Sequence, residues 1–316
     1  MVRGLAVLDR LARRAPDLKA ALVAPRRHAA WGASRGVTVW SPPETAQAKQ
    51  PLAAWAASLP TPRRLVSDVF PRGVLGELAP VLPRLERRAW LVSRRVRPRA
   101  WLAPETRDAL ESRYERLLWC EPPPGELAGL ELAQGHVGPI LIARPEDCLD
   151  ASAARAELRL APGDPVVLML GSGSAEEQHD RLRLLLKARA RLAQDGGPRF
   201  QLVALSARLP PAREPGLVVQ DVFPAMRVLR AAHLLVAGGG YASWHEAHAL
   251  GLPALFLPQP RPWDDQAARV AATRPPTTPE ALESDLARLL RDPPRPEPTP
   301  TPDGADAVAT ALLEAG

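Results

Sequence analysis

The sequence is poor in cysteine, in long apolar runs and in aromatic residues. Cysteine occurs only at Cys120 and Cys148, which excludes a disulfide framework and a Cys-x-x-Cys metal or redox motif. A membrane-spanning helix needs about 18 consecutive apolar residues, and no uncharged apolar run in the sequence is that long. The first residues also lack the apolar core of a secretory signal peptide. Aromatic residues make up only 4% of the chain. We therefore expect a globular protein of the cytoplasm.

The overall composition fits two folded domains with unevenly placed charge. The 316 residues are 46% hydrophobic and 24% charged, and domains usually hold about 100–200 residues. Residues 1–150 hold 23 Lys/Arg against 16 Asp/Glu, with a dense cluster from Arg84 to Arg99. Two interpretations of this cluster stay open: a solvated basic face, or a patch that faces an anionic substrate or membrane. We expect no nucleic-acid partner, because the cluster lacks interleaved aromatics and accompanies no DNA-binding motif.

Short apolar runs alternate with helical patterns, which predicts an α/β chain with parallel sheets. The Pro-, Asp- and Gly-rich stretch Arg144–Pro165 interrupts them and is typical of a linker. We predict domains at residues 1–145 and 146–292, then a Pro-rich spacer and a short helix at 293–316. The predicted strands are Ala20–Ala24, Gly36–Trp40, Leu65–Ser67, Trp90–Ser93, Leu117–Trp119, Ile140–Ile142, Val166–Leu170, Phe200–Leu205, Leu217–Val219, Leu234–Ala237 and Ala254–Leu257.

The sequence opens on a helix rather than on a strand. Leu5, Leu8 and Leu11 form one stripe of an amphipathic helix over Val2–Arg14. In a doubly wound fold the first strand normally lies centrally, and the turn after it lines the ligand crevice. We therefore expect the amino-terminal domain of the chain as given to lack its first strand and the loop that follows it.

Two glycine-containing turns each follow a predicted strand and precede a predicted helix. Gly171–Ser174 leads into a leucine-rich helix at Ala175–Ala193, and the free N–H groups of such a helix start favour a phosphate. Gly238–Gly240 allows a ligand to approach the backbone closely and leads into the helix that holds Glu246. A tight turn without a ligand and a merely buried or solvated glutamate are the alternatives.

A third candidate site begins after the last predicted strand. Asp265 and Gln266 stand at a predicted helix start, where they bind a ligand or simply cap the helix. His245 and His248 do not predict a metal site, because they are three residues apart and the zinc motif His-Glu-x-x-His needs four.

Together these blocks resemble the C-terminal domain of family 28 glycosyltransferases, which include the UDP-N-acetylglucosamine-dependent enzymes that form lipid II. The resemblance covers most of residues 160–290 and includes Gln220–Met226, Gly238–Gly240 and Gly251–Pro253. In the amino half it is weaker and rests on Arg3–Ala6 and Ser67–Gly73. It implies the glycosyltransferase-B fold, in which two Rossmann-like domains face a cleft, with a UDP-sugar as donor.

The resemblance also implies roles for individual residues. Ser172 or Ser174 would donate a hydroxyl to the diphosphate, Glu246 would accept from the ribose, and Gln266 with Asp265 would contact the donor sugar. Phe223 would lie along the uracil. The implied donor-binding residues are Gly171, Ser172, Gly173, Ser174, Phe223, Gly239, Gly240, Glu246, Asp265 and Gln266.

The general base is not among the residues that the resemblance supplies. The family's Gly-His loop would stand before Met1, and the sequence does not contain it. We predict Asp68, at the end of a predicted strand, as the base, with a capping role as the alternative. Arg72 is expected to meet an acceptor or donor phosphate. We expect no cofactor and no required metal, because backbone dipoles and hydroxyls would stabilise the leaving diphosphate.

These features lead to a predicted function with two alternatives. The leading prediction is an inverting, UDP-sugar-dependent transfer of a hexosyl or N-acetylhexosaminyl group to an unidentified lipid-linked or saccharide acceptor. A nucleotide-sugar hydrolase or epimerase on the same fold is one alternative, and a non-catalytic UDP-sugar-binding remnant or subunit is the other. An anionic membrane surface is a further expected partner of the basic amino half, which would place the protein at the inner face of the membrane.

Overall fold

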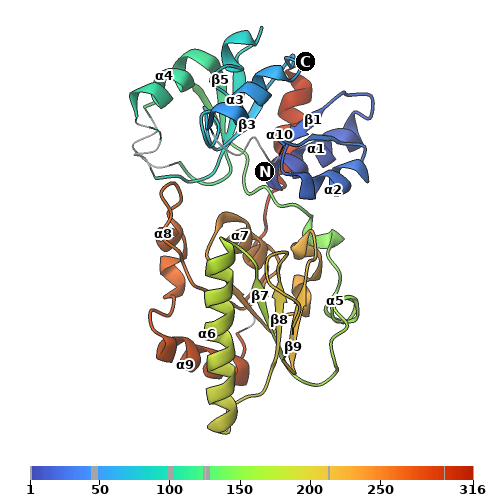
Figure 1. Ribbon diagram of the computed structural model, residues 1–316, viewed down its shortest axis with the longest axis vertical. Helices are drawn as coiled ribbons and strands as arrows, with labels where there is room; N and C mark the ends of the chain where they lie inside the picture. The colour runs from blue at the N-terminus through green and yellow to red at the C-terminus, as the bar shows by residue number, and fades with distance from the viewer. Residues whose placement is uncertain are drawn as a thin grey trace. The chain divides into compact units, whose positions relative to one another are not determined.

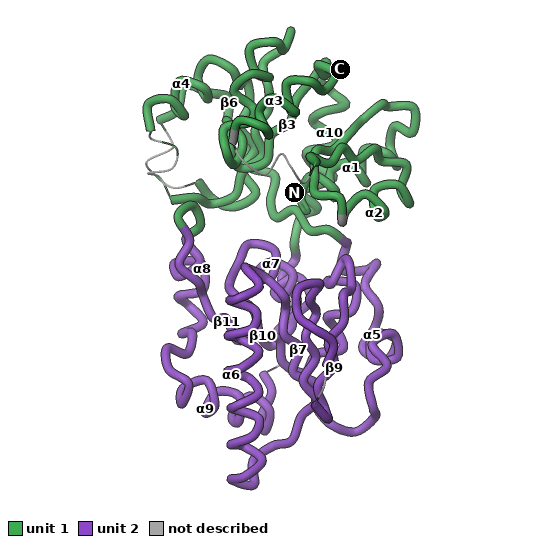
Figure 2. The backbone as a smooth tube through the Cα atoms, in the orientation of Figure 1, with its two compact units in different colours: residues 1–142, 262–264, 301–316 green, residues 143–261, 265–300 purple. Residues whose placement is uncertain are grey.

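The chain forms two compact α/β units (Figure 2). The computed structural model describes all residues except Met1, 44–48, 98–100, Leu102, Pro124, 126–128, Arg213, Arg295 and Gly316. Unit 1 consists of residues 1–142, 262–264 and 301–316, and unit 2 of residues 143–261 and 265–300. No helix in the described part of the chain combines the length and the apolar character needed to cross a bilayer.

Unit 2 is built on a five-stranded parallel sheet in the order β11-β10-β7-β8-β9, of which Figure 1 labels β7, β8 and β9 and Figure 2 labels β10 and β11. Its strands are β7 (Val166–Leu170), β8 (Gln201–Leu205), β9 (Leu217–Gln220), β10 (Leu234–Ala237) and β11 (Ala254–Phe256). Its helices are α5 (Ala151–Glu157), α6 (Ala175–Gln194), α7 (Tyr241–Ala249), α8 (Gln266–Val270) and α9 (Pro279–Arg291), with short 3-10 helices at Pro145–Asp147, Ala225–Ala231 and Ala271–Thr273.

The core of unit 2 explains why its central strands are continuous apolar runs. Every residue of β7, β8 and β10 is buried, as expected for a parallel sheet with helices on both faces. Leu185 and Leu192 of α6 pack in the same cluster as Leu282 and Leu286 of α9. The predicted helix over Ala175–Ala193 and the predicted central strands are thus confirmed to within a residue or two.

The strand order of unit 2 reverses next to β7. From β7 the chain proceeds to β8 and β9 on one side, and then crosses to β10 and β11 on the other. β7 and β10 are parallel neighbours in register, with Met169 opposite Val236. In open α/β sheets, ligands bind at the carboxyl ends of the strands that flank such a reversal. The turns after β7 and β10 therefore mark the expected ligand site.

Unit 1 contains two separate parallel sheets, β1-β2 and β3-β4-β5-β6. Its strands are β1 (Ala21–Val23), β2 (Thr38–Trp40), β3 (Val66–Asp68), β4 (Ala89–Ser93), β5 (Tyr114–Trp119) and β6 (Ala133–His136). Its helices are α1 (Val2–Arg14), α2 (Ala29–Ala33), α3 (Lys49–Ser58), α4 (Pro104–Arg113) and α10 (Gly304–Glu314), with 3-10 turns at Arg26–His28 and Leu82–Arg84. The core of the larger sheet includes the stacked rings of Trp101 and Trp119, 5.3 Å apart.

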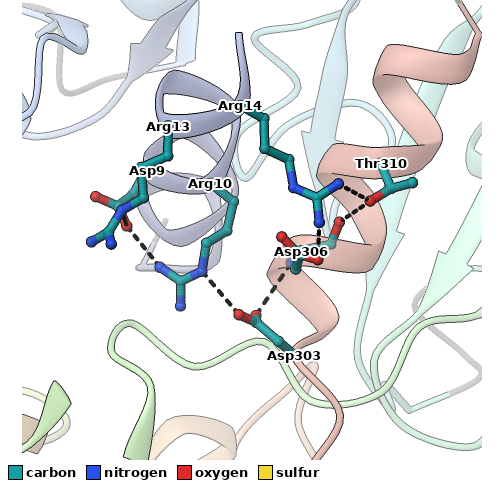
Figure 3. Close-up of polar contacts among 7 residues, drawn as sticks. All are labelled: Asp9, Arg10, Arg13, Arg14, Asp303, Asp306 and Thr310. Atoms are coloured by element: carbon teal, nitrogen blue, oxygen red, sulfur yellow. Dashed lines mark hydrogen bonds and ion pairs between the residues drawn. The ribbon is translucent and has the colours of Figure 1, made fainter. Parts of the chain in front are cut away.

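The final helix, α10, packs against the first helix, α1, within unit 1 (Figure 3). Arg10 is 2% exposed, and its Nε donates to Asp303 at 3.0 Å. Arg14 forms an ion pair with Asp306 and donates to the hydroxyl of Thr310 at 2.8 Å. Of the two pairs, that of the buried Arg10 matters more for the arrangement of the two helices, because loss of its partner would leave a buried charge uncompensated, whereas Arg14 is half-exposed.

One predicted strand is wrong, and one strand was missed. Ile140–Ile142 is buried but forms no strand, because this apolar segment packs against the returning chain, where Gly304 donates its N–H to the carbonyl of Pro139 at 3.1 Å. The fourth strand of the larger sheet is instead Ala133–His136. It lies at the sheet edge and is largely exposed, so it lacks the apolar pattern that would reveal it.

Candidate donor-binding site

The glycine turns after β7 and β10 lie against each other. A Cβ atom at Gly238 would lie 3.0 Å from the Ser172 Oγ and 2.8 Å from the Nη2 of Arg181. The two turns therefore leave no room for a side chain at Gly238. The structure thus brings together the two turns that the sequence indicated, at the carboxyl ends of neighbouring strands.

Gly239 and Gly240 differ in what they require of the backbone. Gly239 has a φ of +70°, and a Cβ there would lie 2.9 Å from Cγ1 of the buried Val270. Gly240 is the N-cap of α7 with a φ of −67°, and a Cβ there would have no heavy atom closer than 3.8 Å, the Nε2 of Gln266. Only Gly239 therefore needs to be glycine on backbone grounds.

We predict that Gly239→Ala destabilises the protein and that Gly240→Ala does not. The strained φ and the overpacking against Val270 together cost about 1–3 kcal/mol, whereas the alanine at Gly240 makes ordinary contacts. Urea denaturation of both variants beside the wild type measures the difference. Equal destabilisation by the two neighbouring substitutions would show that the positive φ is not a constraint.

Glu246 lies on α7, one to two turns after this glycine turn. The residue is only 7% exposed, and burial raises the pKa of its carboxyl to about 7. Among the described residues no hydrogen-bond or ion-pair partner of this carboxyl is found. A buried acceptor without a donor is suited to the hydroxyl groups of a ligand.

The turn after β7 is shaped by a capping box. Ser174 is the N-cap of α6, and its Oγ accepts from the N–H of Glu177 at 3.2 Å, while the Glu177 carboxylate accepts from the N–H of Ser174 at 2.7 Å. Arg261 donates to the same carboxylate from both of its terminal nitrogens, with Nη2 to Oε2 at 2.7 Å. This ion pair lowers the pKa of Glu177 to about 2.

Gln266 and Asp265 are placed differently. Gln266 is 7% exposed, its Oε1 accepts from the N–H of Gln259 at 3.0 Å, and its amide faces Gly240. Asp265 caps α8 by accepting from the N–H of Ala268 at 3.2 Å. Phe223 follows β9 with its side chain 39% exposed, at the same edge of the sheet but beyond the strand that neighbours β7. Gln266 is therefore the residue of this group that the structure places beside a glycine turn.

The predicted residues of the amino half both form ion pairs within unit 1. Asp68, at the end of β3, lies 2.8 Å from the guanidinium of Arg3. Burial alone would raise the pKa of Asp68, but the positive charges beside it, Arg3 foremost, hold it well below its usual value. Arg72 pairs with the exposed Glu105 at 2.8 Å. A general base works best when its pKa lies near the working pH, so this pairing disfavours Asp68 as the base.

Three residues around the turn after β7 were not predicted from the sequence. Arg181 is 2% exposed, and its Nη1 donates to the carbonyl of Leu170 at 3.0 Å, whereas its Nε and Nη2 have no partner among the described residues. Glu177 and Arg261 are the other two. The capping-box spacing of Ser174 and Glu177 was a signal in the sequence, whereas nothing there indicated that Arg261 would reach α6.

Comparison with known proteins identifies the relatives of the chain. No model of a known protein family matches it. It is similar to two enzymes named UDP-N-acetylglucosamine–N-acetylmuramyl-(pentapeptide) pyrophosphoryl-undecaprenol N-acetylglucosamine transferase. The enzyme from Mycolicibacterium paratuberculosis is 29% identical over 53% of the chain, and that from Mycobacterium ulcerans is 28% identical over 68%. The matches span only 47% and 56% of the relatives' own lengths, about half.

Solved structures match almost the whole chain in fold. The glycosyltransferase of kitacinnamycin covers 99% of the chain at a TM-score of 0.60 and 18% identity, with 90% of its own length matched. MurG of Acinetobacter baumannii covers 99% at a TM-score of 0.54 and 13% identity, with 95% of its length matched. UDP-GlcNAc 2-epimerase of Methanocaldococcus jannaschii covers 100% at a TM-score of 0.66 and 13% identity, with 97% of its length matched. The chain thus has the two-domain glycosyltransferase-B fold, and its sequence resembles the lipid-II-forming N-acetylglucosaminyltransferases.

Proposed function

We propose that this protein is a glycosyltransferase that takes a hexosyl or N-acetylhexosaminyl group from a UDP-sugar bound by unit 2. The sequence relatives are N-acetylglucosamine transferases, as their names state, which supports this choice of activity. Solved structures of the same fold include one in complex with UDP-GlcNAc and UDP and one with thymidine diphosphate, which supports a nucleotide-sugar donor.

Glu246 is the observation that carries this proposal. It is a buried carboxyl without a described partner, on the helix that follows the glycine turn at the strand-order reversal. A ribose offers two neighbouring hydroxyl donors, which satisfy such a group. The diphosphate would then bind at the turn after β7, where α6 presents the N–H groups of its first turn and the Ser172 hydroxyl has no partner among the described residues. Gln266 is left for the donor sugar.

The reaction that follows is a direct displacement at the anomeric carbon. An acceptor hydroxyl attacks the sugar carbon, the bond to the diphosphate breaks, and the configuration inverts. The leaving diphosphate gains negative charge, and the positive end of the α6 dipole at Ser174 lowers the energy of that charge. We propose that no metal ion is required, and that adding EDTA leaves turnover unchanged. Asp68 stays the predicted base for the acceptor proton, although its pairing with Arg3 disfavours it.

Binding of UDP is expected to release a proton from Glu246. Its carboxyl has a pKa of about 7 in the unliganded protein. Ribose hydroxyls donate to the charged form, so binding lowers this pKa. Affinity therefore rises with pH up to about pH 7 and then levels off. Isothermal titration near pH 6.5, in buffers of different ionisation enthalpy, counts the released protons.

The nucleotide also releases protons when it binds, and a matched variant of the protein measures this contribution so that it can be subtracted. Glu246→Gln keeps a side chain of the same shape without the titrating group. The wild type is expected to release more protons than this variant. An equal release by both proteins would mean that Glu246 does not contact the nucleotide.

Product analysis tests the activity against its alternatives. The full chain is incubated with UDP-N-acetylglucosamine or UDP-glucose, with and without saccharide and lipid-linked acceptors, and the products are resolved by NMR. The proposal predicts UDP release that depends on an acceptor, with an inverted glycosidic bond. Acceptor-independent release of free sugar would indicate a hydrolase, and a changed sugar still attached to UDP an epimerase. Binding without any turnover would indicate a non-catalytic protein.

We also propose that a basic recess of unit 1 meets an anionic membrane surface. Four arginines and two glutamates line a recess of about 630 Å³ around Trp90. The arginines are Arg64, Arg87, Arg88 and Arg116, the glutamates are Glu86 and Glu115, and Arg64 and Arg116 lie over the Trp90 ring. The arginine cluster of the sequence is not one patch, since Arg94 pairs with Asp264 and Arg84 bonds the carbonyl of Ala57. Arg99 lies outside the described residues.

This membrane proposal predicts charge-selective vesicle binding. Each arginine near an anionic surface contributes about 1 kcal/mol at low salt. Cosedimentation with phosphatidylglycerol vesicles should exceed that with phosphatidylcholine vesicles and should fall in the Arg87→Gln/Arg88→Gln variant. Equal sedimentation with both lipids would remove the membrane from the proposal.

A further inference from the structure

The start of α6 already holds a negative charge of the protein's own. The Glu177 carboxylate folds back over Gly173, where a Cβ would collide with the Oε2 of Glu177, and accepts from the N–H of Ser174. Two nitrogens of Arg261 clamp the same carboxylate. The carboxylate thus occupies one of the N–H groups that a phosphate at this turn would use.

The positive charge around this turn exceeds what Glu177 neutralises. Arg181 of α6 is 2% exposed, and its Nη1 donates to the carbonyls of Leu170 and Ser172 in this turn. Its Nε and Nη2 have no partner within the part of the chain that the structure describes. The Glu177 carboxylate is the negative charge near Arg181 as well as near Arg261, so one carboxylate faces two guanidiniums. Because a buried charge that is not fully compensated is costly, this excess of positive charge points to a second anion. The Nη2 of Arg181 and the unpartnered Oγ of Ser172 both lie close to the Cβ position of Gly238, which places that anion at the meeting of the two glycine turns.

We propose that Glu177 is an internal substitute for the donor diphosphate, and that the arriving diphosphate displaces it and takes over Arg261. The inference rests on the proposed function, since it names the residues that exchange partners when a nucleoside diphosphate binds. The carboxylate and the diphosphate cannot both bind the N–H of Ser174 and the two terminal nitrogens of Arg261. The carboxylate therefore moves out toward solvent when the diphosphate binds. Arg261 is thereby a phosphate-binding residue in the liganded protein, and Glu177 sets how tightly the diphosphate binds.

The test uses the full chain and a matched neighbour on the same helical turn. Glu177→Gln keeps the capping box, because glutamine also serves at this position, but removes the competing charge. Glu176→Gln removes an equal charge from the adjacent, exposed position in the first turn of α6. Titrations with UDP and with uridine, which lacks the diphosphate, separate effects on the phosphates from effects on the fold.

The expected results differ between the two ligands. Glu177→Gln should bind UDP about three- to tenfold more tightly than the wild type, which lies within the range for a partly buried charge at a helix start. Glu176→Gln should gain less than about twofold, because an exposed charge is screened. Uridine affinity should not change in either variant. A Glu177→Gln affinity for UDP equal to that of Glu176→Gln, or below the wild type, would overturn the inference. If Glu177→Gln fails to fold, Glu177→Ala takes its place with the same expected result.

A double variant tests the transfer of Arg261. If Arg261 binds the diphosphate, Glu177→Gln/Arg261→Gln should bind UDP about tenfold more weakly than Glu177→Gln alone. If Arg261 only neutralises Glu177, the two proteins should bind UDP equally, and the arginine part of the inference fails. Absence of UDP binding by the folded wild type would instead refute the proposed function itself.

Discussion

Glu246→Ala is expected to weaken UDP binding by about 1.5–3 kcal/mol, roughly ten- to hundredfold, the range for hydrogen bonds to a charged group. The wild-type carboxyl is buried without a described partner, so ribose hydroxyls replace no existing bond when they dock. Isothermal titration with UDP measures the loss. Glu280→Ala, on the first turn of α9, is the exposed control and should bind UDP as the wild type does.

The same carboxyl should reduce stability at high pH, and the sign follows from its pKa. In the folded protein Glu246 has a pKa of about 7, raised from its ordinary 4.5. Between these values the unfolded chain is ionised and the folded chain is still protonated, so stability falls as the pH rises from about 4.5 to 7. Above pH 7 the penalty is complete. Glu246→Gln should therefore melt at a higher temperature than the wild type at pH 8 but not at pH 4. A group that loses affinity yet gains stability when replaced is serving a ligand; lower stability of the variant at pH 8 would mark Glu246 as structural.

Removing residues 301–316 is expected to destabilise unit 1 and to leave UDP binding in place. The deletion takes away α10, whose Val308 and Ala309 are fully buried, and uncovers the face of α1 that holds Arg10 and Arg14. Each large apolar side chain that becomes exposed costs roughly 1.5–3 kcal/mol. Arg10 also loses Asp303, which leaves a buried guanidinium short of one partner. The truncated chain should unfold in unit 1 more than about 5 °C below the wild type.

Tryptophan fluorescence reports this loss selectively. Of the eight tryptophans, only Trp244 lies in unit 2, so the fluorescence melt follows unit 1. A milder variant is Gly304→Ala, whose Cβ would collide with the carbonyl of Gly138 and lie 2.7 Å from that of Pro139. Ala307→Ser, at an exposed position of the same helix, is its control. A truncated chain with an unchanged fluorescence melt would mean that α10 does not stabilise unit 1.

The fold was predictable where burial and chain periodicity agree. β7 and β10 are apolar on both faces, and the leucines of α6 recur at helical spacing, so both types of element were evident from the sequence. The strand predicted at Ile140–Ile142 was wrong, because an apolar run indicates that a segment is buried but not what it packs against. Here it packs against the chain that returns near Gly304 and not against another strand. The exposed edge strand Ala133–His136 had no apolar signal to detect.

The sequence predicted the glycine turns of the site but not the charged residues around them. Glycine turns between strand and helix identify themselves, because few other residues fit them. Arg181 instead occupies the buried stripe of α6, four and eleven residues before Leu185 and Leu192, and an arginine in that stripe reads as an interruption of the apolar pattern. Arg261 comes from a loop more than eighty positions away in the sequence, 84 from Glu177, so its pairing depends on tertiary structure that local patterns do not contain.

A crystal structure of the full chain with UDP would show whether unit 2 binds the donor. We predict the diphosphate between the turns Gly171–Ser174 and Gly238–Gly240, with the ribose hydroxyls within about 3 Å of the Glu246 carboxylate, the distance of an O–H···O bond. We also predict that UDP is absent when crystals of Glu246→Ala are soaked at a concentration that just saturates the wild type. UDP bound elsewhere on the chain, or no UDP in wild-type crystals at saturating concentration, would contradict the assignment of unit 2 as the donor-binding unit.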